Sequence, residues 1–350
     1  DHKIFQREAD ETGLLEGSRM IKHEGKYYLL MISHVYAPGR HRRQVCYRAD
    51  DIRGPYEKKV ILQSDFDKAG YVGQGTIVDG NDGKWYGVIF QDRGGVGRIL
   101  THMPCRWIDG WPILGDENGL VPAQMPQGGD EVKGTNLVIS DDFNDEKLHL
   151  LWQWNHNPVD EAWSLTERKG YLTLHALPSE SFKKARNTLT QKSMGYTGEF
   201  TIKLNVSALK DGDHAGLACM GRTNHQVGIK KENGKLYLYV GEDEATASDK
   251  FKKATSNELR ATNDELPATQ NSSLITKSTI YLRLHLDGLR NVYSFSYSYT
   301  DNDKFFTPIG ESFAMRFGHW KGVRPALFCY NTMGEGGKAM VDWARYRIKD

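Results

Sequence analysis

The chain has 350 residues, which is enough for two domains that each bury a substantial core. It carries 46 lysines and arginines against 45 aspartates and glutamates, a net charge of +1 without a dense basic stripe, so the composition gives no support to a nucleic-acid partner. Because no apolar run approaches the roughly 20 residues of a membrane-spanning helix, we also expect no membrane partner.

Strand patterns separated by turns fill the first third of the chain. β-Branched and aromatic residues predict strands over 26–33, 44–48, 75–78, 84–91 and 98–103. Between the third and fourth of these, residues 79–83 tolerate positive φ and predict a hairpin turn. The polar, glycine-rich segment from Gln91 to Arg98 follows that hairpin, in a position where loops often carry function.

Residues 119–134 interrupt this pattern and indicate a domain boundary. The stretch contains Pro122 and Pro126 among several glycines and shows no periodicity, as expected of a linker that runs over the surface. We therefore predict two domains, formed by residues 1–127 and residues 128–350.

Beyond the linker the pattern is again one of strands without alternating helices. Strands are predicted over 171–174, 200–206, 214–220, 226–231, 235–240 and 292–300. In the last of them Tyr293, Phe295 and Tyr297 alternate with serines, and this period of two places the aromatic rings on one face. Residues 256–266 are compatible with one or two helical turns or with a solvated excursion. The recurring strands favour an antiparallel sandwich.

Several separated motifs occur in one order along the chain. Leu15-Glu16-Gly17 opens a strand, turn and strand that ends in Tyr27-Tyr28, and the further motifs are 73–98, 109–115, 141–144 and 151–158. With these motifs the chain resembles glycoside hydrolase family 43, the xylosidases and arabinofuranosidases, over almost its whole length. The resemblance implies an all-β fold. Residues 1–127 are then the C-terminal part of a five-bladed β-propeller, followed by a concanavalin-like jelly-roll β-sandwich.

Glu16 stands where the family carries its general acid. The resemblance therefore implies that Glu16 protonates the oxygen of the departing sugar, a task that needs a pKa raised toward the working pH. Taken without the resemblance, a surface glutamate that precedes a strand is the alternative.

The catalytic base is not apparent in the sequence. Inversion needs a carboxylate roughly 6.5 to 9.5 Å from the acid, and the resemblance places this aspartate in the first blade, with a second, pKa-tuning aspartate in an intervening blade. Only fifteen residues precede Glu16, and Asp1 and Asp10 are too close to it to lie in an earlier blade. We expect residues 1–13 to end a middle blade and an upstream segment or second chain to complete the propeller.

Three further residues are nominated for substrate binding. Arg98 matches an arginine that the family places beside sugar hydroxyls, with a surface salt bridge as the alternative. Gln74 stands where many relatives have a histidine near the propeller axis, and its amide can still bind water. Trp320 matches a sandwich-loop aromatic that either stacks on sugar or packs between domains. Asp92 and Arg93 are expected to pair with each other.

No cofactor is expected. The histidines lack the spacing of a metal site, and glutamine in place of histidine at position 74 disfavours a central metal ion. From the resemblance alone, Asp142 and Asp342 are nominated for a structural calcium ion in the sandwich. The four cysteines lie far apart in the sequence and are expected to be buried and free, namely Cys46, Cys105, Cys219 and Cys329.

These features predict a hydrolase that releases arabinofuranosyl or xylosyl units from xylan or arabinoxylan by inversion, with an oligo- or polysaccharide as partner. The alternative is a non-catalytic carbohydrate-binding fragment, because a sandwich by itself does not settle function. The chain opens on Asp1 without a signal-peptide pattern. Secretion or export to the periplasm is expected, with the cytoplasm as the alternative.

Overall fold

The computed structural model describes residues 3–9, 11, 13–35, 41–67, 70–125, 138–243, 272–316, 318 and 320–349. The chain divides into two compact units. The first consists of Asp1–Arg93 and Arg98–Gly134, and the second of Gly94–Gly97 and Thr135–Asp350. Within the described ranges, no helix has the length and apolar character that a membrane crossing requires. Residues 256–266, which were considered for helical turns, lie outside these ranges.

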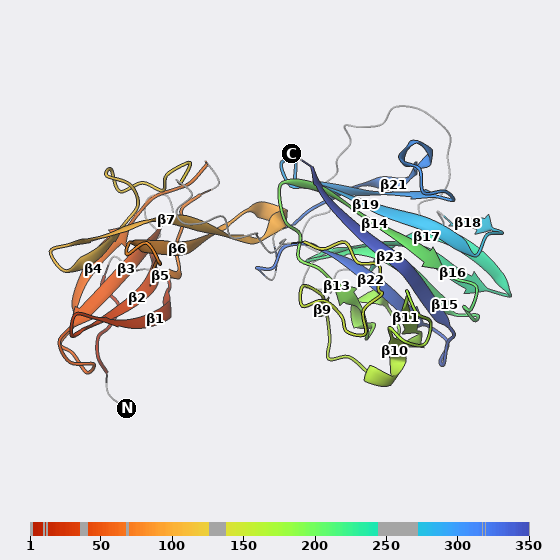
Figure 1. Cartoon of the computed structure of the whole chain (residues 1–350), viewed down its shortest axis with the longest axis horizontal. Coiled ribbons are helices and arrows are strands. Elements are labelled where there is room, and N and C mark those ends of the chain that lie inside the picture. The colour runs from red at the N-terminus through yellow and green to blue at the C-terminus, as the bar shows by residue number, and fades with distance from the viewer. Residues whose placement is uncertain are drawn as a thin grey trace. The chain divides into compact units, whose positions relative to one another are not determined.

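The first unit contains two four-stranded antiparallel sheets (Figure 1). The first sheet is formed by β1 (Leu15–His23), β2 (Lys26–Val35), β3 (His41–Ala49) and β4 (Glu57–Leu62). The second is formed by β5 (Gly75–Asp79), β6 (Trp85–Asp92), β7 (Arg98–Ile108) and β8 (Trp111–Leu114), with the 3-10 turn η1 (Gly94–Val96) between β6 and β7. In both sheets each strand pairs with its neighbour in sequence, which is the arrangement expected of a propeller blade.

The two sheets pack face to face through one hydrophobic core. Tyr28 and Leu30 of β2 meet Ile89, Met103 and other side chains of the second sheet in this cluster, and all four are at most 2% exposed. The opposite face of β2 is covered as well, because Leu29 and Met31 pack with Ile4 and Phe5 of the N-terminal segment. Strand β2 is therefore buried on both faces, which explains its nearly continuous apolar sequence.

The segment before β1, which we expected to end a middle blade, packs against the first sheet. Its described residues form no strand, and Phe5 instead stacks on Tyr47 of β3 with ring centres 4.0 Å apart. Glu11 is fully buried and pairs with Lys58 of β4 at 2.7 Å. Aromatic stacking and this ion pair thus hold the segment against the face of the first sheet.

The second unit is a sandwich of a seven-stranded and an eight-stranded sheet (Figure 1). The seven-stranded sheet has the order β10 (Trp163–Ser164), β11 (Leu172–His175), β23 (Lys338–Lys349), β14 (Thr197–Asn205), β19 (Thr279–Asp287), β20 (Val292–Ser298) and β21 (Thr307–Ala314). The eight-stranded sheet has the order β18 (Ser272–Ile275), β17 (Lys235–Asp243), β16 (Asn224–Glu232), β15 (Asp213–Met220), β22 (Arg324–Asn331), β13 (Leu189–Thr190) and β9 (Gln153–Trp154), with β12 (Leu177–Pro178) beside β22. The 3-10 turns of this unit are η2 (Asp160–Ala162), η3 (Phe182–Lys184) and η5 (Asp303–Phe305).

Alternation along the strands builds the core of the sandwich. In β20 Tyr293 and Phe295 are 2% and 1% exposed, whereas Ser294 and Ser296 belong to the opposite face, as predicted from the sequence. The predicted strand at 200–206 is confirmed as β14, which begins three residues earlier. Strands β19, β22 and β23 were not predicted.

The predicted linker does not lie over the surface along its whole length. Val121 is 8% exposed and belongs to the core of the first unit, and its backbone N–H donates to Ser64 Oγ at 3.1 Å. Residues 126–137 are outside the described ranges, and the division between the two units falls at Gly134. The first residues of this stretch therefore complete the core of the first unit.

Candidate active site

Glu16 lies at a bulge in the edge strand β1. The pairing of β1 with β2 shifts between Glu16 and Arg19, and Gly17 adopts a φ of +67° at this point. A bulge re-aims the side chains around it and is common beside functional sites. The Glu16 side chain is exposed. The bulge therefore leaves Glu16 at the surface, directly before the residues that line a cavity.

Gln74 approaches this bulge from the segment before β5. It also has a positive φ, of 67°, and its side chain fills the space beside Gly17, where a Cβ would lie 2.2 Å from Gln74 Nε2. Its backbone N–H donates to Gln44 Oε1 at 2.8 Å. Gln44 is fully buried, and its Nε2 has no hydrogen-bond partner in the described structure, which leaves a buried donor next to Gln74. The sequence analysis did not identify Gln44.

One cavity of the first unit brings three predicted segments together. It has a volume of about 560 Å³ and is lined by Gly17, Ser18, Arg19, Gln74, Gly75, Phe90, Arg98 and Leu100. Gln74 and Arg98, which lie near opposite ends of the motif 73–98, thus line the same cavity as the residues that follow Glu16. Glu16 itself is not among the lining residues.

Asp92 holds two arginines at this cavity. Its Oδ1 accepts a hydrogen bond from Arg98 Nε at 3.0 Å, and its Oδ2 pairs with Arg42 Nη2. The guanidinium of Arg98 also lies over the ring of Phe90, with its Cζ 3.9 Å from the ring centre. Arg98 is therefore both an ion-pair residue and part of the cavity wall, and its donor fork is fixed in orientation.

His34 of β2 is influenced electrostatically by both this charge cluster and Glu16. Burial lowers the pKa of His34, and the positive charge of Arg42 lowers it further, while the negative charge of Glu16 acts in the opposite direction. His34 is therefore neutral at neutral pH, and the carboxylate of Glu16 is close enough to influence it. His34 was also missed in the sequence analysis, because no motif marks it.

The expected pairing of Asp92 with Arg93 is wrong. Asp92 bridges Arg42 and Arg98, whereas Arg93 Nη1 bonds Asp67 at 2.8 Å. Consecutive residues at the end of a strand point to opposite faces, so adjacent opposite charges do not meet. Gln91 has a structural role, since it is fully buried and its Nε2 donates to the carbonyl of Phe66 at 2.8 Å.

Trp320 lies on an exposed turn of the second unit. Its side chain is 59% exposed and its φ is +56°. The neighbouring carbonyl of Lys321 accepts a hydrogen bond from Lys192 Nζ at 2.7 Å, and the same ammonium donates to the carbonyl of Val96 at 3.2 Å. Lys192 therefore ties the Trp320 turn to η1, which is part of the same unit and ends two residues before Arg98 in the chain.

The two aspartates nominated for calcium, Asp142 and Asp342, differ in their surroundings. Asp342 Oδ2 already bonds Lys203 Nζ at 2.6 Å and Tyr171 Oη at 3.1 Å, so a cation would have to displace an ammonium group. Asp142 is exposed. No group of three or more histidine, cysteine, aspartate or glutamate side chains in the described ranges could hold a metal ion. The four cysteines are buried and free, as predicted.

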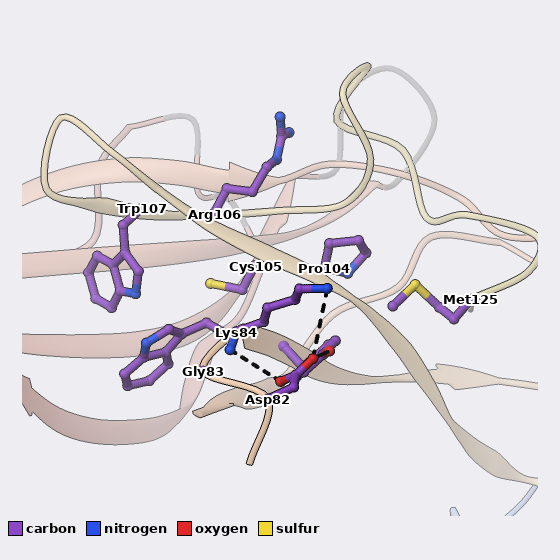
Figure 2. A pocket seen from close by; sticks show the side chains of 10 residues that line it. Asp82, Gly83, Lys84, Pro104, Cys105, Arg106, Trp107 and Met125 are labelled. Carbon is purple, nitrogen blue, oxygen red and sulfur yellow. Dashed lines mark hydrogen bonds and ion pairs between the residues drawn. The ribbon is translucent and has the colours of Figure 1, made fainter. Parts of the chain in front are cut away.

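A second cavity of the first unit, of about 470 Å³, lies where β6 begins and β7 ends (Figure 2). Trp85, Tyr86 and Trp107 contribute aromatic walls, and Asp82 is the carboxylate of its lining. Asp82 accepts hydrogen bonds from Tyr86 Oη at 2.5 Å and from the Lys84 backbone N–H at 3.2 Å, and the first of these is the main cause of a lowered pKa for Asp82. A carboxyl group with a lowered pKa is a poor proton donor, so this cavity does not suit acid catalysis.

Two family models match the chain. Residues 1–112 match glycosyl hydrolases family 43, and residues 140–347 match the beta xylosidase C-terminal concanavalin A-like domain. A protein of Xylanibacter ruminicola is 34% identical over 90% of this chain and 55% of its own length. The beta-xylosidase of Formosa agariphila is 29% identical over 99% of this chain and 64% of its own length. The chain thus spans 55% and 64% of the lengths of these two relatives.

Solved structures agree with this assignment. The bifunctional GH43-CE protein of Bacteroides eggerthii is 35% identical, with a TM-score of 0.81, over 96% of this chain and 41% of its own. An engineered GH43 glycoside hydrolase with endo-xylanase and exo-arabinofuranosidase activity is 26% identical, with a TM-score of 0.82, over all of this chain and 67% of its own. The predicted all-β fold, propeller blades followed by a concanavalin-like sandwich, is confirmed. The chain belongs to glycosyl hydrolase family 43, among the members that carry the beta-xylosidase C-terminal domain.

Proposed function

We propose that the protein carrying this chain releases xylosyl or arabinofuranosyl units from xylan or arabinoxylan by inversion, with Glu16 as the general acid. The observation that supports this most is the cavity in which Gln74 and Arg98 lie beside Gly17–Arg19, the residues that follow Glu16. The beta-xylosidase and the non-reducing end alpha-L-arabinofuranosidase among the relatives indicate pentose substrates.

Glu16 and the residues that line the cavity have separate roles in the proposed reaction. Glu16 donates its proton to the departing oxygen, and the guanidinium of Arg98, fixed by Asp92, donates hydrogen bonds to sugar hydroxyls. Phe90 and Leu100 supply apolar surface for the carbon-bound hydrogens of the ring. An inverting enzyme also needs a carboxylate base on the far side of the sugar.

We infer that this base comes from a segment outside the chain. The described lining of the cavity contains no carboxylate, and Asp92 is already engaged by two arginines. Glu16 is exposed, so the burial that raises the pKa of a general acid must come from the same outside segment or from bound substrate. Hydrolysis of an aryl xyloside by this chain, compared with a version extended by the upstream coding region, tests this. Equal turnover by both would place the base within the chain.

The role of Glu16 is tested in the extended version by Glu16→Gln. General acid catalysis contributes about 10²- to 10⁴-fold, so kcat on xylobiose, which has a poor leaving group, should fall by about 10²-fold or more. Hydrolysis of a dinitrophenyl xyloside, which needs no protonation, should stay within about tenfold of wild type. Glu24→Gln, in the exposed turn between β1 and β2, is the matched control and should change neither rate. Equal losses on both substrates would remove Glu16 from the acid role.

A further inference from the structure

The outward face of the seven-stranded sheet in the second unit carries a cluster of buried polar side chains. The register pairs Glu199 of β14 with His285 of β19, and Arg283 of β19 with Ser296 of β20. Glu199, Arg283 and Ser296 are 8%, 6% and 3% exposed, although they lie on the face that points away from the sandwich core. Polar groups buried on an outward face need a structural or a binding reason.

Part of the reason is the segment after β20, which folds back over this face. Arg283 pairs with Asp303 of η5, donates from Nε to Thr201 Oγ1 at 2.9 Å, and lies 3.6 Å from the ring centre of Phe306. The guanidinium is therefore fixed by an ion pair, a hydrogen bond and an aromatic ring at once. A donor group held this firmly is pre-organised for a ligand.

The histidine of the cluster is equally fixed. His285 Nε2 bonds Ser296 Oγ at 2.8 Å, and Nδ1 lies 3.0 Å from Glu199 Oε1, which also accepts from Lys349 Nζ at 2.6 Å. Burial lowers the pKa of His285, against the opposing effect of Glu199, so the ring is neutral at neutral pH. Ammonium and carboxylate groups have more donor and acceptor positions than these contacts use.

These side chains surround a cavity of about 370 Å³. It is lined by Glu199, Arg283, His285, Ser296, Asp303, Phe306, Pro308 and Lys349. Two carboxylates and two cations line it, and Arg347, outside the lining, also pairs with Asp303 at 3.2 Å, so each charge already has a partner of opposite sign. A neutral polyol can use the donor and acceptor positions that remain. Phe306 and Pro308 add an apolar wall, and the volume lies within the range of small-ligand sites.

We propose that this cavity binds a neutral saccharide, as a carbohydrate site built from residues other than those of the cavity beside Glu16. The choice of xylan chains as its ligand rests on the proposed function. The combination of fixed polar groups of both signs with an aromatic wall is what hydroxyl-rich, uncharged sugars require, because their hydroxyls both donate and accept. A divalent cation is disfavoured, since both carboxylates already have cationic partners.

The test is titration of xylohexaose into the full chain by isothermal calorimetry, on an Arg98→Ala background that weakens binding at the first cavity. Loss of the Phe306 wall in Phe306→Ala should weaken the remaining binding by about tenfold. Phe305→Ala is the matched control, because Phe305 is adjacent, 63% exposed and not part of the lining, and it should leave binding unchanged.

A second pair of variants keeps the proposal testable if Phe306→Ala does not fold. Lys349→Ala removes a lining cation and should weaken xylohexaose binding, whereas Lys304→Ala, in the exposed turn η5, should not. In the version extended by the upstream coding region, with Arg98 intact, Phe306→Ala and Lys349→Ala should hydrolyse an aryl xyloside at the parental rate, so failure of binding and failure of hydrolysis are distinguishable. Absence of binding on the Arg98→Ala background, or equal binding by all four variants, would overturn the proposal.

Discussion

At the scale of single residues, Asp92 has the clearest positioning role. One oxygen of its carboxylate fixes Arg98 and the other fixes Arg42, and the side chain is only 17% exposed. Both guanidinium groups lie near the ring of Phe90, with Cζ 3.9 Å and 5.7 Å from its centre. Asp92 does not itself line the cavity, whereas Arg98 does, so we propose that Asp92 acts on substrate through Arg98.

Asp92→Asn is expected to raise KM for an aryl xyloside by about tenfold with a smaller change in kcat. The amide keeps the shape of the side chain but loses the charge that orients both arginines, and a charge-assisted hydrogen bond contributes about 1.5–3 kcal/mol. Steady-state kinetics of the catalytically competent protein measure the two constants separately. Asp67→Asn, which weakens the more exposed pair with Arg93, is the control and should leave both constants unchanged. A normal KM in Asp92→Asn would show that Arg98 is oriented without it.

The role of a residue could be predicted from the sequence where a motif contains the residue. It could not be predicted where the role depends on the register between two strands. Gln74 and Arg98 were nominated from motifs, and both line the cavity. Asp92 was assigned to its sequence neighbour Arg93, although the β6–β7 register places Asp92 opposite Arg98. The register of a hairpin is set by its turn, which here contains η1. Residues 94–97 include three glycines, and the length of the turn could not be predicted from them.

At the scale of elements, the bulge in β1 determines how closely Gln74 approaches. Gly17 combines a φ of +67° with a position at which a Cβ would lie 2.2 Å from Gln74 Nε2 and 2.5 Å from its Cδ. Any larger residue must therefore displace the Gln74 side chain or straighten the strand. The backbone of Gln74 sits at a positive φ and donates to Gln44, so the displacement falls on the Gln74 side chain.

Gly17→Ala is expected to lower the free energy of unfolding by about 1–3 kcal/mol and to lower kcat/KM together with it. The methyl group overlaps Gln74, so one wall of the cavity has to shift. Gly25→Ala separates the two contributions, because Gly25 has a φ of +82° and nothing within 4 Å of the added Cβ, so it reports the backbone strain alone. Urea unfolding and kinetics of both variants give the comparison. Equal effects of the two substitutions would show that contact with Gln74 has no cost.

Strands could be predicted where apolar residues alternate with small polar residues and no charged side chain intervenes. Strand β20 was recognised from its aromatic and serine alternation. Strand β19 was missed, although Ile280, Leu282 and Leu284 alternate in the same way, because Arg283 and His285 on its other face resemble a solvated loop. Arg283 is instead buried beneath the segment after β20, where it pairs with Asp303, and the half-buried His285 bonds Ser296 of β20. No local pattern reveals these tertiary contacts.

At the scale of the whole molecule, the second unit contains buried neutral histidines whose protonation opposes folding. Burial lowers the pKa of His214 and of His225 to about 4 each. His214 lies parallel to Tyr330, with ring centres 5.0 Å apart, and its Nδ1 bonds Tyr239 Oη at 3.0 Å. His225 stacks on Phe313 at 3.8 Å. Between pH 6.5 and about 4, the unfolded chain therefore binds protons that the folded sandwich excludes.

We therefore expect these histidines not to reduce the free energy of unfolding above pH 6.5. The free energy of unfolding should then fall as the pH is lowered from 6.5 to about 4. Each such histidine lowers the free energy of unfolding by at most about 1.4 kcal/mol for each pH unit, so His214 accounts for a loss of up to about 3 kcal/mol over this range. His214→Phe keeps the ring on Tyr330 but removes the titrating group. Urea unfolding at pH 7, 6, 5 and 4 should show the difference between wild type and His214→Phe shifting by that amount in favour of the variant. His102→Phe, at an exposed position of β7, should show no such drift. Parallel curves for wild type and His214→Phe would mean that His214 accepts its proton without cost to the fold.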